Sequence, residues 1–131
     1  MEIESVITDV GIINSRDAIS FNSFDHKDTT LIFSLDINSE LLDVKSNDFI
    51  KYTIIFNDVI LYECYGLDFY DLSLLQSFFD IIKNSKLIEE LKHLGNNKIT
   101  NEHRRYRLAT YDYIYEIISS KYILKTNLVK H

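Results

Sequence analysis

The stretch HRRYRLATYDYIYEIISSKYILKT, residues 103–126, decides the fold that we predict for this chain. Residues 105–108 alternate arginine with an aromatic or aliphatic side chain, which is the period-two pattern of a half-buried strand. Residues 113–118 are apolar or aromatic apart from Glu116, which is typical of a strand covered on both faces. We therefore predict a hairpin at the centre of a sheet, with the earlier strands arranged around it.

Several earlier segments also carry strand patterns. Residues 30–37 place four apolar side chains on one face, the clearest alternation in the chain. Residues 49–65 are long and apolar with a break at Asn57-Asp58, which fits either a tight hairpin or a bulge in one long strand, and we predict two strands. Residues 3–13 and 19–21 are weaker strand candidates. Polar segments separate these strands as predicted turns or connections: residues 14–17, 24–28 and 38–48.

Residues 70–92 allow two interpretations. Their apolar residues fall at helical spacing, which favours one long helix, but Asn84-Ser85 interrupts the run with residues that favour a helix start. The apolar positions after Ser85 define an amphipathic helix that ends before Gly95. We predict a strand over 77–83, followed by a helix over 85–94 that Ser85 caps.

These patterns predict an α+β fold of one domain, residues 1–131. It consists mostly of an antiparallel sheet of about six to eight strands, with a sandwich as one arrangement, and at least one packed helix near 85–94. Hydrophobic residues make up 46% of the chain and aromatic residues 13%, which excludes the composition of a disordered protein. No apolar run reaches the roughly 18 residues of a membrane span.

The N-terminal residues and the cysteine content indicate a compartment. The sequence begins MEIES, with acids where a secretory signal would carry bases, so we expect no export by that route. Cys64 is the single cysteine and has no partner for an internal disulfide, which fits a reducing cytoplasm. We expect Cys64 to be buried and inert.

Charge is distributed unevenly along the chain. Net charge is −6, but residues 1–80 hold fifteen acids against four bases, and residues 81–131 hold five acids against ten bases. The first part would repel phosphates, and the arginines near 104–107 are too few for a nucleic-acid binder, so we expect no nucleic-acid partner. We expect those arginines to project from one strand face and to pair with acids across the sheet.

Few residues suggest chemistry. The four histidines are scattered, Cys64 has no CxxC partner, and no glycine-rich phosphate loop occurs, so we expect no metal and no cofactor. A small enzyme remains an alternative, with Cys64 beside His93 or His103, or with an acid pair such as Asp68 and Asp71. A second alternative is a scaffold that adds an edge strand to a partner.

Three ordered motifs carry a resemblance. FNDV at 56–59, IIKNS at 81–85 with a helix behind it, and HRRYRLATYDYIYEII at 103–118 resemble small bacterial proteins that look like immunity proteins of polymorphic or contact-dependent toxin systems. The likeness covers residues 49–118, and this chain departs from the pattern by inserting Arg104-Arg105 between His103 and Tyr106.

The resemblance implies a cytoplasmic, non-enzymatic inhibitor that binds a cognate protein toxin, and it transfers no catalytic residue. The acidic first part of the chain agrees with binding to a basic toxin such as a nuclease. As contributors to that binding we select four acids: Asp58, Glu63, Asp68 and Asp71.

Overall fold

The computed structural model describes residues 2–6, 19–38, 49–71, 73, 75–94 and 99–129. Within these residues the chain forms nine strands and one α-helix, and the two sheets are antiparallel, so the predicted α+β class is confirmed. The elements in chain order are β1 (Glu2–Ser5), β2 (Ile19–Lys27), β3 (Thr30–Asn38), β4 (Phe49–Asn57), β5 (Leu61–Gly66), the 3-10 turn η3 (Leu67–Phe69), β6 (Phe79–Lys83), α1 (Lys86–His93), β7 (Arg104–Ala109), β8 (Tyr113–Ser119) and β9 (Lys121–Val129).

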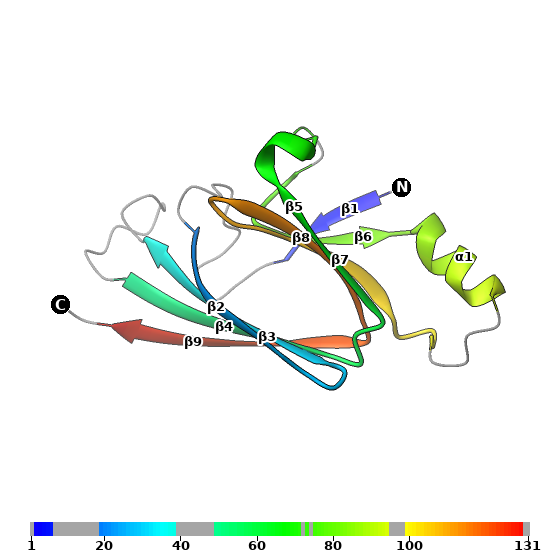
Figure 1. The fold of residues 1–131 in the computed structure, drawn as a ribbon, viewed down its shortest axis with the longest axis horizontal. Helices are drawn as coiled ribbons and strands as arrows, with labels where there is room; N and C mark the ends of the chain where they lie inside the picture. Colours follow the sequence, from blue (N-terminus) through cyan, green and yellow to red (C-terminus); the bar gives the residue numbers. More distant parts are fainter. Residues whose placement is uncertain are drawn as a thin grey trace.

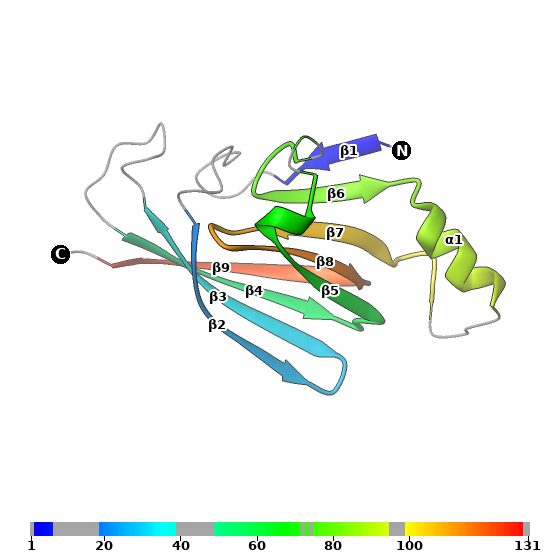
Figure 2. The same cartoon turned by 45° about the horizontal axis from the view of Figure 1, so that its top comes forward.

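The strands form two stacked sheets. The five-stranded sheet has the order β1-β6-β7-β8-β5, and the four-stranded sheet has the order β2-β3-β4-β9. Figure 1 shows the two layers converging where β4 meets β5 and β8 meets β9, while Figure 2 shows the strand order of each sheet. The inner faces of the two sheets enclose the main core, as in a β-sandwich.

The stretch from residue 103 to 126 occupies the predicted central place. β7 and β8 pair with each other in the middle of the five-stranded sheet, and six of the seven residues of β8 are buried. Tyr106 and Leu108 face the core, as the alternation predicts. The prediction missed β9, because the chain leaves the hairpin at Ser120 and enters the other sheet.

One bent ribbon belongs to both sheets. β4 pairs with β9 up to Asn57 and Lys121 in the four-stranded sheet, and β5 pairs with β8 from Leu61 and Ile118 in the five-stranded sheet. The segments β4–β5 and β8–β9 therefore both pass from one sheet to the other at the same corner. The predicted break at Asn57-Asp58 is confirmed, but the link is this corner and not a hairpin or a bulge.

Side chains and a left-handed residue hold the corner. Asp58 has φ 52°, a conformation that Asp tolerates better than most residues, and its carboxylate accepts a 2.7 Å hydrogen bond from Ser120 Oγ. Ser119 is fully buried, and its Oγ lies 2.7 and 2.8 Å from the carbonyl oxygens of Asn57 and Lys121, which share its single hydrogen. Ser119 thus contacts backbone carbonyls at the bend, and Ser120 holds the side chain of Asp58.

His103 also stabilises the corner. The Thr100 backbone N–H donates to Nδ1 at 3.0 Å, so Nδ1 carries the lone pair and Nε2–H donates to the Asp58 carbonyl at 3.0 Å. The ring is buried, and both of its nitrogens are satisfied. His103 is a structural residue in this arrangement.

Aromatic rings fill much of the space between the sheets. Phe33 meets Tyr115 with ring centroids 5.1 Å apart, and Phe79 meets Tyr122 at 5.0 Å, in edge-on geometries that favour aromatic attraction. Phe56 bridges the two groups by contacting Phe33 and Phe79. These contacts join residues of opposite sheets or neighbouring residues on one sheet face. The packing of the core therefore requires both sheets.

Helix α1 covers the outer face of the five-stranded sheet at the corner end. Ile88 packs with Ile99 and Ile118, and with partly buried residues of β5 and the helix itself. The strand before α1 excludes the single long helix. Ser85 occupies the position before the helix as predicted, but its side chain makes no capping hydrogen bond, so the predicted cap is wrong. Its Oγ instead accepts a long 3.5 Å contact from Arg105 Nη1.

One predicted turn is shorter than expected, and several predicted features fall outside the described residues. Residues 24–27 belong to β2, so the turn predicted at 24–28 is reduced to Asp28 and Thr29, because β2 continues its pairing with β3 to the end of the hairpin. The predicted features at residues 7–18 and 39–48 and at Gly95 lie outside the described residues. Within the described ranges, no helix has the length and apolar character that crossing a membrane requires.

Two serine variants test this account of the corner. Ser119→Ala removes the one buried hydroxyl shared by two carbonyls, so we expect it to lower the free energy of unfolding by about 1–3 kcal/mol. Ser85→Ala removes no capping bond and only a long 3.5 Å contact with Arg105, so it should cost less than Ser119→Ala. Urea unfolding measures both values. Equal losses in the two variants would contradict the role of Ser119.

Candidate functional site

A network of charged and polar side chains covers the outer face of the five-stranded sheet. Arg107 Nη2 and Asp80 Oδ2 form an ion pair at 3.1 Å, with both side chains almost fully buried. Next to it, Arg105 Nη2 donates to both oxygens of Glu116 at 3.1 and 3.0 Å. The expectation that these arginines share a strand face and pair with acids across the sheet is confirmed for Arg105 and Arg107.

Several donors form hydrogen bonds with the Asp80 carboxylate. Besides Arg107, its carboxylate accepts the backbone N–H groups of Gln76 and Ser77 at 3.0 and 3.3 Å and the Ser77 hydroxyl at 2.7 Å. A buried charge needs this number of partners because removal from water costs several kcal/mol per ion. The network therefore fixes residues 76–77, the end of the connection from β5 to β6.

Tyr70 anchors the middle of the same connection. Its hydroxyl accepts a 3.0 Å hydrogen bond from Arg107 Nη1 and donates to Glu116 Oε1 at 3.1 Å. The ring of Tyr70 also lies 5.5 Å from the ring of Tyr65 on β5. This anchoring holds η3 and the residues after it against the sheet, so the exposed acids nearby have a defined position.

The four acids selected from the sequence are exposed and lie along one edge. β5 is the terminal strand of the five-stranded sheet, with Asp58 before it, Glu63 within it, and Asp68 and Asp71 after it. The six residues of β5 span about 20 Å at the usual strand rise, so the acids form a row and not a cluster. We call this row, with the exposed side chains between its members, the acidic edge.

Besides Asp58, which binds Ser120, two members of the row make hydrogen bonds to nearby residues. Glu63 accepts a hydrogen bond from the Tyr65 hydroxyl and lies directly opposite Glu116 in the β5–β8 register. Asp71 accepts the backbone N–H of Ser73 at 3.1 Å and its hydroxyl at 2.6 Å, and these bonds lower the pKa of the Asp71 carboxyl. Both acids remain exposed, so they keep their charges at the surface.

Exposed aromatic side chains accompany the acids, and the sequence analysis missed them. Phe69 in η3 is 86% exposed, and Tyr62, Tyr111 and Tyr113 are 38%, 56% and 45% exposed. Tyr113 pairs with Gly66, and the Phe69 ring lies 3.7 Å from the position of a Gly66 Cβ, so both aromatics flank Gly66. Periodicity gave no signal for Phe69, because it follows the last strand residue in an irregular turn.

The expectation that Cys64 is buried is wrong. Cys64 is exposed, because β5 has a neighbour on only one side and its middle residues face solvent. His103 binds Asp58, six residues before Cys64 along a mostly extended chain, which places it roughly 15–20 Å away. The structure therefore does not bring Cys64 and His103 together. Among the residues that the structure describes, no group of three His, Cys, Asp or Glu could hold a metal ion.

The three motifs of the resemblance meet at the corner end of the molecule. Asp58 of FNDV binds His103, and Ser85 of IIKNS contacts Arg105. These contacts show that the motifs maintain the fold at this end. No family model matches the chain, and neither a curated protein nor a solved structure matches it.

Removal of the buried charge tests the network. Asp80→Asn leaves the Arg107 guanidinium buried without its counter-charge, so we expect a loss of about 3–5 kcal/mol in the free energy of unfolding. Asp68→Asn changes charge equally at an exposed position and should stay within about 0.5 kcal/mol of wild type. Urea unfolding of both variants measures the difference. A loss below 1 kcal/mol in Asp80→Asn would show that the network does not anchor the connection.

The tyrosines predict how stability depends on alkaline pH. Burial raises the pKa of Tyr70, Tyr106, Tyr115 and Tyr122, and the hydrogen bond to Glu63 raises the pKa of Tyr65 to about 12. An unfolded tyrosine ionises near pH 10, so the folded state holds these protons longer. Their contribution to stability is complete below about pH 10 and is lost as pH rises through the folded-state values.

In ultraviolet tyrosinate absorbance of the native protein, these five tyrosines should therefore ionise above the pH near 10 at which unfolded tyrosine ionises. Glu63→Gln should lower the pH at which one of them, Tyr65, ionises. A single titration of all nine tyrosines near pH 10, before any unfolding, would contradict this prediction.

Proposed function

We propose that this chain is a toxin-neutralising immunity protein, a non-enzymatic inhibitor that binds a basic cognate toxin through the acidic edge. The observation that carries the proposal is the charge of residues 52–82, which include five acids and no lysine or arginine. One of the five, Asp80, is buried in the network, and the other four are the exposed acids of the edge.

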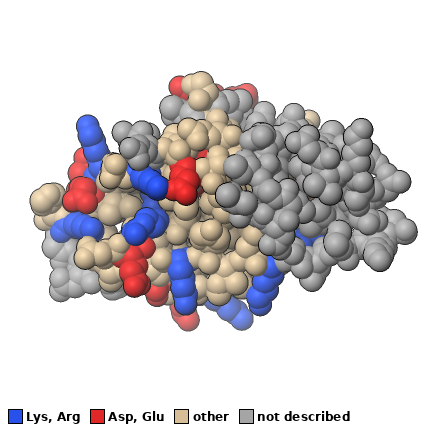
Figure 3. Space-filling model, turned by 180° about the vertical axis from the view of Figure 1, so that it is seen from behind, with Lys and Arg blue, Asp and Glu red and all other residues tan. Residues whose placement is uncertain are grey.

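The distribution of charge over the surface supports the same partner. Figure 3 shows Lys and Arg, mixed with acids, over the end that carries α1, while acids without neighbouring bases mark the upper rim, where the connection from β5 to β6 lies. A row of like charges with no internal counter-charge attracts a partner of the opposite sign and increases its encounter rate. A nuclease toxin, whose active site must attract phosphates, has that sign.

The exposed aromatic side chains provide binding energy that the exposed charges do not. Charges at an interface rim mainly set the association rate, whereas desolvated aromatic residues provide most of the binding energy. Phe69 is the most exposed large hydrophobic residue of the described chain, and Asp68 precedes it directly. The network around Tyr70 holds this segment in place before binding, which reduces the entropy lost on association.

The resemblance of residues 49–118 to immunity-type proteins gives the proposal its biological class. In that class the protein remains in the cytoplasm of the producing cell and covers the toxin after synthesis or entry. Such an inhibitor needs no catalytic residue, and its specificity depends on the surface that it presents to its own toxin.

The electrostatic part of the proposal predicts association kinetics. Replacing Asp68 and Asp71 together by Asn should slow association with the toxin encoded beside this chain by about three- to tenfold at low salt, with a smaller effect on dissociation. Raising the salt should slow wild-type association, because exposed charges are screened over about 8 Å at physiological ionic strength. Stopped-flow mixing across a salt series measures both rates.

The matched control replaces Glu89 and Glu90 by Gln. This pair removes two exposed charges from α1 and leaves all four acids of the acidic edge in place, so it should leave association almost unchanged. Equal slowing by both double variants would show that the effect depends on net charge alone. An association rate that does not depend on salt would refute the role of the acidic edge.

The aromatic part predicts dissociation instead. Phe69→Ala should accelerate dissociation of the toxin complex at least tenfold, because truncation of a buried interface aromatic typically costs more than 1 kcal/mol. Leu94→Ala is the control, since Leu94 is 79% exposed at the end of α1 and lies away from the acidic edge. Surface plasmon resonance measures both dissociation rates. Loss of affinity in Leu94→Ala but not in Phe69→Ala would place the interface elsewhere.

A further inference from the structure

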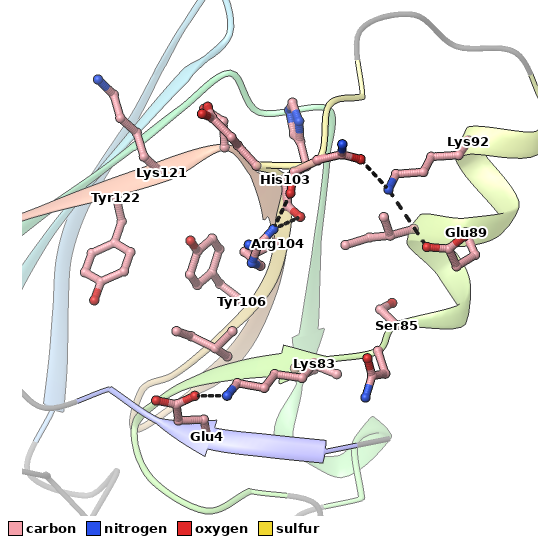
Figure 4. A pocket seen from close by; sticks show the side chains of 17 residues that line it. Glu4, Lys83, Ser85, Glu89, Lys92, His103, Arg104, Tyr106, Lys121 and Tyr122 are labelled. Carbon is pink, nitrogen blue, oxygen red and sulfur yellow. Dashed lines mark hydrogen bonds and ion pairs between the residues drawn. The ribbon is translucent and has the colours of Figure 1, made fainter.

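A cavity of about 930 Å³ opens beside α1, and its lining includes His103 and Ser120, which contact Asp58 of the acidic edge. Its walls come from β1, β6, residues 101–103, β7, the first residues of β9 and the helix (Figure 4). Ligand sites in proteins typically have volumes of about 300–1,000 Å³ and combine apolar walls with a few converging polar groups. The side chains of this cavity follow that description.

Two tyrosines form the aromatic wall. The rings of Tyr106 and Tyr122 lie 5.5 Å apart at an angle of 78°, and both residues line the cavity. Tyr106 is only 4% exposed as a residue, and its hydroxyl makes no hydrogen bond within the described part of the chain. The hydroxyl is not enclosed by protein, so water or a ligand in the cavity can bind it.

Charged side chains surround this wall, and most of them are paired. Lys83 Nζ and Glu4 Oε2 lie 2.5 Å apart, and Lys92 Nζ is 3.9 Å from Glu89 Oε1 and 3.5 Å from Asn101 Oδ1. These lysines are therefore largely neutralised within the cavity wall. Glu102 is the third carboxylate of the lining.

Arg104 differs from Lys83 and Lys92, whereas Lys121, the third lysine of the lining, likewise has no ion pair among the described residues. Its Nη1 donates to the main-chain carbonyls of Asn101 and His103 at 2.6 and 3.1 Å, and it forms no ion pair among the described residues. These two bonds hold the guanidinium in place while Nη2 and Nε keep their hydrogens for another acceptor. Figure 4 shows Arg104 between Tyr106 and the helix. The Nε–Nη2 edge of an arginine matches the two oxygens of a carboxylate or phosphate.

We propose that this cavity binds a small organic anion with a flat ring, whose carboxylate or phosphate contacts Arg104 and whose ring packs against Tyr106 and Tyr122. Arg104 is one of the two arginines that this chain inserts after His103 relative to the proteins it resembles. The other, Arg105, is used by the network on the opposite face of the sheet. This inference does not depend on toxin binding.

The test uses adenosine 5′-monophosphate and benzoate as probes, with adenosine and inorganic phosphate as comparison arms. Amide resonances of residues 104–106 and 121–122 should shift saturably with both probes. Binding by each comparison arm should be at least tenfold weaker than binding of adenosine 5′-monophosphate, because each lacks one of the two contacts.

Variants then assign the anion contact. Arg104→Gln should weaken the binding of both probes about tenfold or more, and Arg104→Lys should weaken it less. Lys125→Gln is the matched control, because Lys125 is exposed on β9 but does not line the cavity. It should change affinity less than twofold. Circular dichroism and urea midpoints establish that each variant is folded.

Three results would overturn the inference. The first is the absence of localised shifts with both probes at millimolar concentration. The second is an equal loss of affinity in Arg104→Gln and Lys125→Gln, which would indicate unspecific attraction of anions. The third is a comparison arm that binds as tightly as adenosine 5′-monophosphate, since the ring or the anion would then have no role.

Discussion

The bent ribbon at residues 57–61 and 118–121 is the constraint on which the rest of the structure depends. Because β4 continues into β5 and β8 into β9 at one corner, the two sheets must face each other there. At the bend Ser119 and His103 donate hydrogen bonds to the carbonyls of Asn57 and Asp58, and Ser120 binds the Asp58 carboxylate. The aromatic core between the sheets can then pack, since its two walls are fixed at one end.

The buried ion pair of Asp80 and Arg107 has a more local role. Its desolvation is costly, so it contributes less to stability than its geometry suggests, and hydrophobic residues could fill the same volume. Its effect is positional, because Asp80 fixes the end of the β5–β6 connection and Arg107 holds Tyr70 in the middle of it. The acidic edge is therefore presented by a chain segment that crosses the sheet and is fixed at two points.

The two proposed sites use different parts of the five-stranded sheet and opposite chemistry, and Asp58 is the member of the acidic edge that contacts the cavity lining. The acidic edge has exposed acids and aromatics along β5 and η3, and we propose a basic protein as its partner. The cavity beside α1 has two lysines paired with acids, Glu102, Arg104 and Lys121 without an ion pair among the described residues, and two tyrosines, and we propose a small anion there. Because β7 supplies Arg104 to the cavity and Arg107 to the network that anchors the edge, one strand supports both sites from its two faces.

The sequence by itself determined the local structure and the charge of this protein. Strict alternation identified β3 and β7, an apolar run identified β8, and the residues after Ser85 defined α1, because periodicity reports which face of an element is buried. It also determined which acids lack a neighbouring base. Only the tertiary structure decided that β4 and β5 belong to different sheets, that Cys64 lies on an open edge, and that Arg104 and Arg105 serve opposite faces. These features depend on contacts between residues far apart in the chain, and no local pattern of polar and apolar residues encodes such contacts.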